Sequence, residues 1–241
     1  MESLVFLVWK RYGNIKSGTV VNGSTQRSYI DREDEASPTA ASDYIIITGV
    51  IEAKQGRDVM INDVPNDFVK RPVPQDEGDE IIIMEIQVSM VDIICEISPG
   101  IYKPCVRFDK RSGEKILYVR ILKALYGMII ASLLYYNKFR KDIESIVFEV
   151  NPYDACVANI MVNGKQHTVA WHFGDLNSSH VDPKVKNDFH EWLEKKYRSD
   201  DIGHVEASRV KLYDNLAITL DYTEEGKLKI DMSESLYVVI S

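Results

Sequence analysis

The sequence predicts an α+β fold in which helices pack on one face of an antiparallel sheet. Asn163-Gly164 separates two apolar segments, 156–162 and 166–172, and this dipeptide is the strongest short signal for a β-hairpin. Apolar residues at helical spacing follow Asp182-Pro183 and also occupy 136–146. The order of strands, helix, strands, helix, β-meander, helix and hairpin is satisfied by helices covering one face of such a sheet.

The first third of the chain contains short strands and one helix. Residues 1–35 are expected to form short strands separated by turns, because Gly and Asn recur there. Ser37 and Pro38 suit the N-cap and first position of a helix that ends before Gly56. A short buried strand is then expected at 59–61, ending at Asp63.

The middle and the end of the chain continue the pattern. An acidic turn at 76–80 precedes a β-rich run at 81–86, and a hairpin is predicted over 102–119. A helix is expected around 136–146, and another begins at Pro183 with Asp182 before it. A last hairpin is predicted around Glu224-Glu225-Gly226.

Composition narrows the class of protein. The chain has 241 residues, is 45% hydrophobic and carries a net charge of −8, which argues against a generic basic protein that coats DNA. Its three cysteines match no zinc or disulfide spacing, so we expect a reducing, intracellular compartment. The apolar run 4–9 is too short for a signal peptide or a membrane span, and no membrane association is expected.

Two aspartates are candidate metal ligands because of their positions. Asp63 ends a predicted strand, and Asp175 lies at the tip of a predicted hairpin. Carboxylates placed in this way can hold two divalent ions about 3.5–4 Å apart for phosphoryl transfer. An aspartate at a strand end is also a common turn residue, so position alone leaves both interpretations open.

Several segments, in order along the chain, resemble the reverse transcriptases of copia-type LTR retrotransposons. Residues 122–127, Leu-Lys-Ala-Leu-Tyr-Gly, resemble the Lys-Ala-Leu-Tyr-Gly signature of that family. Residues 63–68, Asp-Val-Pro-Asn-Asp-Phe, resemble its first catalytic motif, and 151–157 resemble the segment before its catalytic hairpin. Residues 171–176, Trp-His-Phe-Gly-Asp-Leu, stand where the family has (Tyr/His)-Val-Asp-Asp-Leu.

The resemblance implies the fingers and palm of a right-hand polymerase, with an antiparallel palm sheet. Residues 1–58 and about 69–130 would be mainly fingers, 59–68 and about 131–222 mainly palm, and 223–241 the palm end or a truncated thumb. Two Mg²⁺ ions, an RNA or DNA primer–template and deoxynucleoside triphosphates would be the cofactors and partners. The integrase and RNase H of the polyprotein are not seen, so the chain looks like a fragment.

The same resemblance assigns roles to individual residues. Asp63 and Asp175 would be the catalytic metal ligands. Contacts with the nucleotide would come from Lys16, Phe68, Tyr126 and Gly127.

Departures from the family predict an impaired enzyme. Gly174 stands where the family has its first hairpin aspartate, and glycine cannot ligate a metal. Loss of that stabilisation costs on the order of 4 kcal/mol, or about a thousandfold in rate. We expect Asp175 not to compensate, since adjacent strand residues point to opposite faces. Gly18, Asp67 and Ile130 replace a basic, a small and a polar residue at positions that meet phosphate or nucleic acid.

Two other interpretations remain open. The chain can be a non-catalytic binding or structural module derived from the reverse-transcriptase fold, because the apolar framework is retained while the site residues are lost. A ferredoxin-like module similar to an RNA-recognition fold is a third possibility, but the paired aromatic residues of such a strand are missing.

Overall fold

A computed structural model describes residues 3–9, 15–28, 37–64, 81–172, 174–198, 203–209, 211–215 and 218–233. The chain divides into two compact units, one made of 1–37 and 68–135 and the other of 38–67 and 136–241. Residues 38–58, which were expected to group with residues 1–37, therefore belong to the second unit. The predicted acidic turn at 76–80 lies outside the described residues.

The first unit contains a hairpin and a small three-stranded sheet. Strands β1 and β2 pair antiparallel from Ser3 opposite Val21 to Trp9 opposite Ile15. The small sheet has the order β4-β6-β5, and the helix α2 follows directly after β4. The elements of this unit are β1 (Ser3–Trp9), β2 (Ile15–Val21), η1 (Gly23–Ser28), β4 (Ile83–Gln87), α2 (Val88–Ile97), α3 (Pro99–Tyr102), η3 (Lys103–Cys105), β5 (Arg107–Phe108) and β6 (Lys115–Arg120).

The second unit is built on a six-stranded antiparallel sheet with the order β11-β3-β10-β9-β8-β7. A separate three-stranded sheet has the order β12-β13-β14. The strands are β3 (Asp58–Asp63), β7 (Glu149–Val150), β8 (Val157–Val162), β9 (Lys165–His172), β10 (Asp175–His180), β11 (Glu206–Ser208), β12 (Leu212–Asn215), β13 (Ile218–Asp221) and β14 (Lys229–Asp231).

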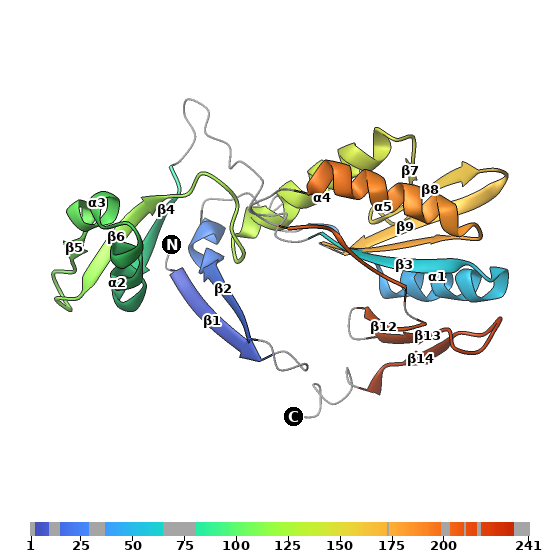
Figure 1. The fold of residues 1–241 in the computed structure, drawn as a ribbon, viewed down its shortest axis with the longest axis horizontal. Helices are drawn as coiled ribbons and strands as arrows, with labels where there is room; N and C mark the ends of the chain where they lie inside the picture. The colour runs from blue at the N-terminus through green and yellow to red at the C-terminus, as the bar shows by residue number, and fades with distance from the viewer. Residues whose placement is uncertain are drawn as a thin grey trace. The chain divides into compact units, whose positions relative to one another are not determined.

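Helices cover both faces of the six-stranded sheet, so the prediction that they pack on one face is wrong. Helix α5 (Pro183–Tyr197) and the later part of α4 (Ile129–Glu144) lie on one face, and α1 (Ser42–Gln55) lies on the other (Figure 1). The reason is that the central strands are buried on both faces, since five consecutive residues of β10, 176–180, are buried. His167 and Ser178 face α5, whereas Thr168 and Ser179 face Arg57 at the end of α1.

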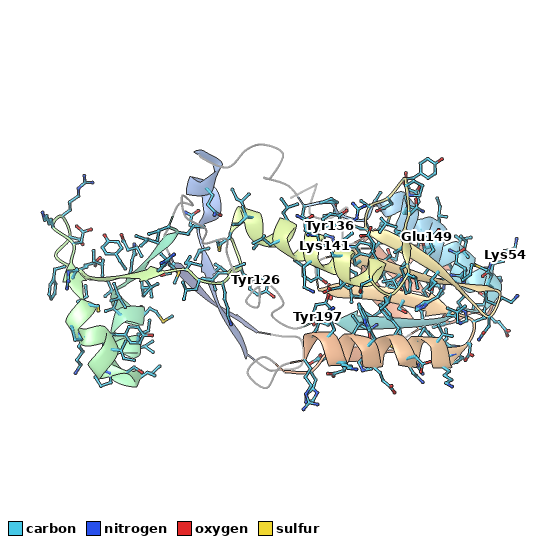
Figure 2. All side chains as sticks on the ribbon, turned by 90° about the horizontal axis from the view of Figure 1, so that it is seen from above. Lys54, Tyr126, Tyr136, Lys141, Glu149 and Tyr197 are labelled. Atoms are coloured by element: carbon cyan, nitrogen blue, oxygen red, sulfur yellow. The ribbon has the colours of Figure 1, made fainter. Side chains whose placement is uncertain are left out.

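Aromatic side chains form the core between the sheet and the helices α4 and α5. Phe139 of α4 is fully buried, and its ring centroid lies 5.1 Å from that of Trp171 on β9. Tyr197, the last residue of α5 and labelled in Figure 2, donates a hydrogen bond to Asp142 Oδ2 of α4 at 2.6 Å. This contact ties the two helices together at the edge of the apolar core.

Local signals in the sequence placed most turns and helix ends correctly. Asn163 and Gly164 adopt positive φ values of 52° and 70°, as a two-residue hairpin turn requires. Asp182 caps α5 by accepting a hydrogen bond from the Lys184 amide at 2.9 Å. Gly56 takes the left-handed conformation after α1, with φ of 58°.

The predicted start of the first helix is wrong. The helix α1 begins at Ser42 and not near Ser37. The amide of Ala41 instead donates to Asp154 Oδ2 at 2.9 Å, so a residue 113 positions away holds the chain before the helix. Helix α2 was not predicted either, because its Val and Ile residues favour a strand by propensity.

No helix in the described part of the chain combines the length and the apolar character that a membrane crossing requires.

Acid is expected to weaken the second unit through His167. Burial, together with the charges of His180, Lys186 and Arg57, lowers the pKa of His167 to about 3. The unfolded chain therefore binds a proton near pH 6.5 that the folded protein does not bind, so the stability is complete above pH 6.5 and is lost as the pH falls toward 3. We expect a loss of about 2 kcal/mol at pH 5, because each pKa unit corresponds to about 1.4 kcal/mol.

Urea unfolding followed by tryptophan fluorescence between pH 7.5 and 5 measures this loss. The double variant His167→Phe/Ser178→Ala should show a flatter pH dependence than Ser178→Ala alone, which removes only the hydroxyl that His167 Nε2 contacts at 2.8 Å. Parallel pH profiles for the two variants would show that His167 is not the responsible group.

Candidate functional site

The structure brings Asp63 and Asp175 together. Asp63 is the last residue of β3, Asp175 is the first residue of β10, and the two are direct partners in the antiparallel register. The Val64 amide donates to the Gly174 carbonyl at 3.0 Å and extends the contact beyond the paired residues. Both aspartates are exposed, and they project from the same face of the sheet because cross-strand partners share a face.

This orientation corrects one expectation. Asp175 was expected to point away from the site because it follows position 174 in a strand. Its pairing with Asp63 instead puts both carboxylates on one face at the end of the two strands. The sequence could not show this, because the register of β3 against β10 depends on residues more than 100 positions apart.

Two further residues on the neighbouring strands extend the cross-strand row of Asp63 and Asp175. Glu206 of β11 pairs with Asp63, and His172 of β9 pairs with Asp175. Burial lowers the pKa of His172, so this imidazole favours its neutral form. Neither residue is indicated by the sequence alone, because β11 is a short exposed strand without an apolar pattern and the five histidines show no ligand spacing.

Gly174 lies against the Asp63 carboxylate. A Cβ atom built on Gly174 would be 3.5 Å from Asp63 Oδ1, so an aspartate side chain there would begin beside Asp63. The same Cβ atom would be 2.9 Å from the backbone oxygen of Val64, which is closer than real Cβ contacts allow. The backbone at the end of β3 thus takes space that a side chain at position 174 needs.

The fit of these residues to Mg²⁺ is partial. Carboxylate oxygens are the ligands that Mg²⁺ prefers, and proteins commonly supply one or two of them, with substrate phosphates completing the coordination. Asp63 and Asp175 provide two such groups, whereas Gly174 provides none. Within the described ranges, no cluster of three or more His, Cys, Asp or Glu side chains has a geometry that could hold a metal ion.

The expected nucleotide contacts of the first unit lie on β2 and on the Tyr126-Gly127 turn, which is hydrogen-bonded to the last residue of β2. Lys16 and Gly18 are residues of β2, paired with Val8 and Phe6 of β1. The Val21 amide, at the end of β2, donates to the Tyr126 carbonyl at 2.8 Å. The strand and the Tyr126-Gly127 turn therefore form one local arrangement.

Gly127 has a clear structural requirement. Its φ is +91°, and a Cβ atom on it would be 2.0 Å from the Val21 carbonyl oxygen. Only glycine fits this conformation and this approach. Tyr126 is partly exposed, and Ile130 is half-buried in the first turn of α4. Asp67 and Phe68 lie outside the described residues.

Comparisons with known proteins show a structural likeness and no family. No protein-family model and no curated protein matches the chain. A solved structure titled apo telomerase from Candida Tropicalis, truncated from its C-terminal domain, is similar at a TM-score of 0.41 and 10% identity. The match covers 95% of this chain and 55% of that chain. A likeness at this level carries no argument about family or activity, so the site must be judged on its own geometry.

Substituting Gly174 tests the close contact with β3. Gly174→Ala should lower the free energy of unfolding by about 1–3 kcal/mol, because the new methyl group meets the Val64 carbonyl and the strand end must shift. Gly100→Ala is the control, since a Cβ atom there has no neighbour within 4 Å. Urea unfolding of both variants measures the difference, and an equal effect at the two positions would contradict the contact.

Proposed function

We propose that the chain is the fingers–palm part of a reverse-transcriptase domain of copia type, with an impaired nucleotidyl-transfer site. The observation that carries the proposal is the pairing of Asp63 with Asp175 at the end of two antiparallel strands, with Gly174 beside the Asp63 carboxylate. In this interpretation Asp63 and Asp175 are the remaining ligands of a site that needs a further carboxylate at position 174.

The chemistry of such a site explains why one missing carboxylate matters. Mg²⁺, when bound, would stabilise the negative charge that develops on the attacking and leaving oxygens of an RNA-directed DNA polymerase reaction. Asp63 and Asp175 would fix its position, and the primer 3′-oxygen would displace pyrophosphate from the incoming deoxynucleoside triphosphate. With Gly174 in place of a ligand, charge stabilisation falls and the rate drops by about a thousandfold.

A basic segment of the first unit supports nucleic acid as the partner. Residues 103–123 contain seven Lys and Arg against two Asp and Glu, a local balance of +5 in a chain of net charge −8. All seven basic residues are exposed, and the aromatic rings of Phe108 and Tyr118 are 65% and 53% exposed within the same segment. Exposed cations with aromatic rings suit a phosphate backbone and stacked bases. The basic side chains are Lys103, Arg107, Lys110, Arg111, Lys115, Arg120 and Lys123.

The second candidate is a non-catalytic module that retains this binding surface. The close approach of Val64 to Gly174 favours it, because a carboxylate at position 174 cannot return without displacing the backbone. The apolar core behind the site is complete, with Phe139, Leu176 and Leu193 fully buried. Packing is therefore retained where the site has lost a ligand.

Primer extension tests the impairment. On an RNA template with a DNA primer and Mg²⁺, the chain should incorporate deoxynucleotides no faster than its Asp63→Ala variant, because the missing ligand already removes most of the charge stabilisation. Robust Mg²⁺-dependent synthesis that Asp63→Ala abolishes would show that the site is active and would overturn the impairment.

Binding to the same primer–template separates the two candidates from a chain without a nucleic-acid role. Fluorescence anisotropy over a range of salt concentrations should show affinity that falls as salt rises. Lys110→Glu/Arg111→Glu should weaken it, whereas Lys184→Glu/Lys195→Glu, at two exposed positions of α5, should not. Equal effects of the two charge reversals would contradict the assignment of the basic segment.

A further inference from the structure

Four polar side chains from four parts of the second unit meet beside α1. Glu52 comes from α1, Asn177 from β10, Tyr213 from β12, and Tyr222 directly follows β13. The Tyr222 hydroxyl donates to Glu52 Oε2 at 2.6 Å, and Asn177 Nδ2 donates to the Tyr213 hydroxyl at 3.0 Å. The two tyrosine hydroxyls are 3.4 Å apart, and their rings are stacked with centroids separated by 5.9 Å.

Two buried oxygen atoms of this group lack a hydrogen-bond donor at normal distance. Glu52 Oε1 and Asn177 Oδ1 are both buried acceptors without a hydrogen-bond partner in the described part of the chain. The Ser179 and Asn177 side chains lie within hydrogen-bonding reach of the Glu52 carboxyl and favour its charged form, so each of them lowers its pKa. Since a buried acceptor without a donor is costly, a single proton between Glu52 and Asn177 would satisfy both oxygens.

The surroundings of Glu52 disfavour a negative charge. Its side chain is 1% exposed, and burial raises the pKa of Glu52 more than Tyr222, Ser179, Arg57 and Asn177 lower it. Arg57, whose charge lowers the pKa of Glu52, uses its Nη1 group on Thr168 and its Nε group on Gln55. Burial and the nearby Glu52 also raise the pKa values of Tyr213 and Tyr222, so both phenols stay protonated.

Two further cations near the carboxyl are paired with Asp58. Lys186, on α5 across the sheet, forms an ion pair with Asp58, and Arg209 approaches the same carboxylate at 3.5 Å. Asp58 and Arg209 line a cavity of about 390 Å³ that Glu52 and Tyr222 also border, together with Lys211 and Glu224. This cavity gives protons from solvent a short path to the group.

We propose that Glu52 is a neutral carboxylic acid whose O–H donates to Asn177 Oδ1. The hydrogen bonds then run in one direction around a closed ring, from Glu52 to Asn177, Tyr213, Tyr222 and back to Glu52. The ring fastens the sheet β12-β13-β14 to α1 and to β10. Because the proton belongs to the folded form, the fastening is present at low pH and is lost as the pH rises through the raised pKa of Glu52.

A competing arrangement has an ionised Glu52. If the Asn177 amide turned over, its Nδ2 group would donate to the carboxylate and its oxygen would accept from Tyr213. The two arrangements differ in one proton, so a method that detects a protonated carboxyl group distinguishes them.

Infrared difference spectroscopy between the wild-type chain and Glu52→Gln provides this test. At neutral pH we expect the C=O stretch of a protonated, hydrogen-bonded carboxylic acid in the wild-type chain and its absence in Glu52→Gln. Glu224→Gln, an exposed glutamate at the same cavity, is the matched control and should leave the band unchanged. A carboxylate band in its place would establish the ionised arrangement and overturn the proposal.

Hydrogen exchange of the backbone amides in β12 and β13 measures how strongly the ring holds the sheet β12-β13-β14 in place. Glu52→Gln, whose amide can donate to Asn177 and accept from Tyr222, should keep wild-type exchange at acidic pH. After correction for intrinsic exchange rates, it should also remove the acceleration expected at alkaline pH. Tyr222→Phe, which opens the ring, should speed exchange by about tenfold, the equivalent of one net hydrogen bond. Unchanged exchange in Tyr222→Phe would show that the ring does not hold the sheet.

Discussion

The pairing of β3 with β10 is the constraint on which the second unit depends. It joins residues 58–63 to residues 175–180 and places β3 between β10 and β11. The register decides which side chains meet, because a shift of one residue would send each side chain to the opposite face. In the observed register Asp63 faces Asp175 at one end, while Asp58 at the other end reaches Lys186 of α5. The candidate site is thus a consequence of strand pairing.

Buried polar contacts help to specify that register. On the α5 face, Asn62 Oδ1 and His190 Nδ1 are 2.9 Å apart across 128 residues of sequence. On the α1 face, Arg57 Nη1 donates to Thr168 at 3.0 Å and lies within 3.5 Å of Ser179. Apolar packing alone would tolerate small shifts, whereas these pairs leave unsatisfied buried groups if the strands slip. The ring around Glu52 lies on the same face. Polar side chains on this face therefore help to set the register of the strands and also attach the sheet β12-β13-β14.

Features determined by neighbouring residues could be predicted from the sequence, and features determined by distant ones could not. Asn163-Gly164 and Asp182-Pro183 carry their own turn and cap chemistry, and both are where the sequence indicates. The start of α1 depends on Asp154, so Ser37-Pro38 was misleading. Asp63 and Asp175 were singled out by their predicted positions at a strand end and a hairpin tip and by a resemblance, but local signals could not show that the two residues pair. Glu206, which completes the row beside Asp63, was indicated by neither kind of signal.

Cross-linking measures the central juxtaposition most directly. In a background without cysteines (Cys95→Ala, Cys105→Ala and Cys156→Ala), the variant Asp63→Cys/Asp175→Cys should form an intramolecular disulfide under mild oxidation. Paired residues in antiparallel strands have Cα atoms about 4.5–5.5 Å apart, which a disulfide can span. Asp63→Cys/Ser178→Cys, out of register and on opposite faces, should remain reduced. A disulfide between 63 and 178, or none between 63 and 175, as read by mass spectrometry of the digested protein, would contradict the account.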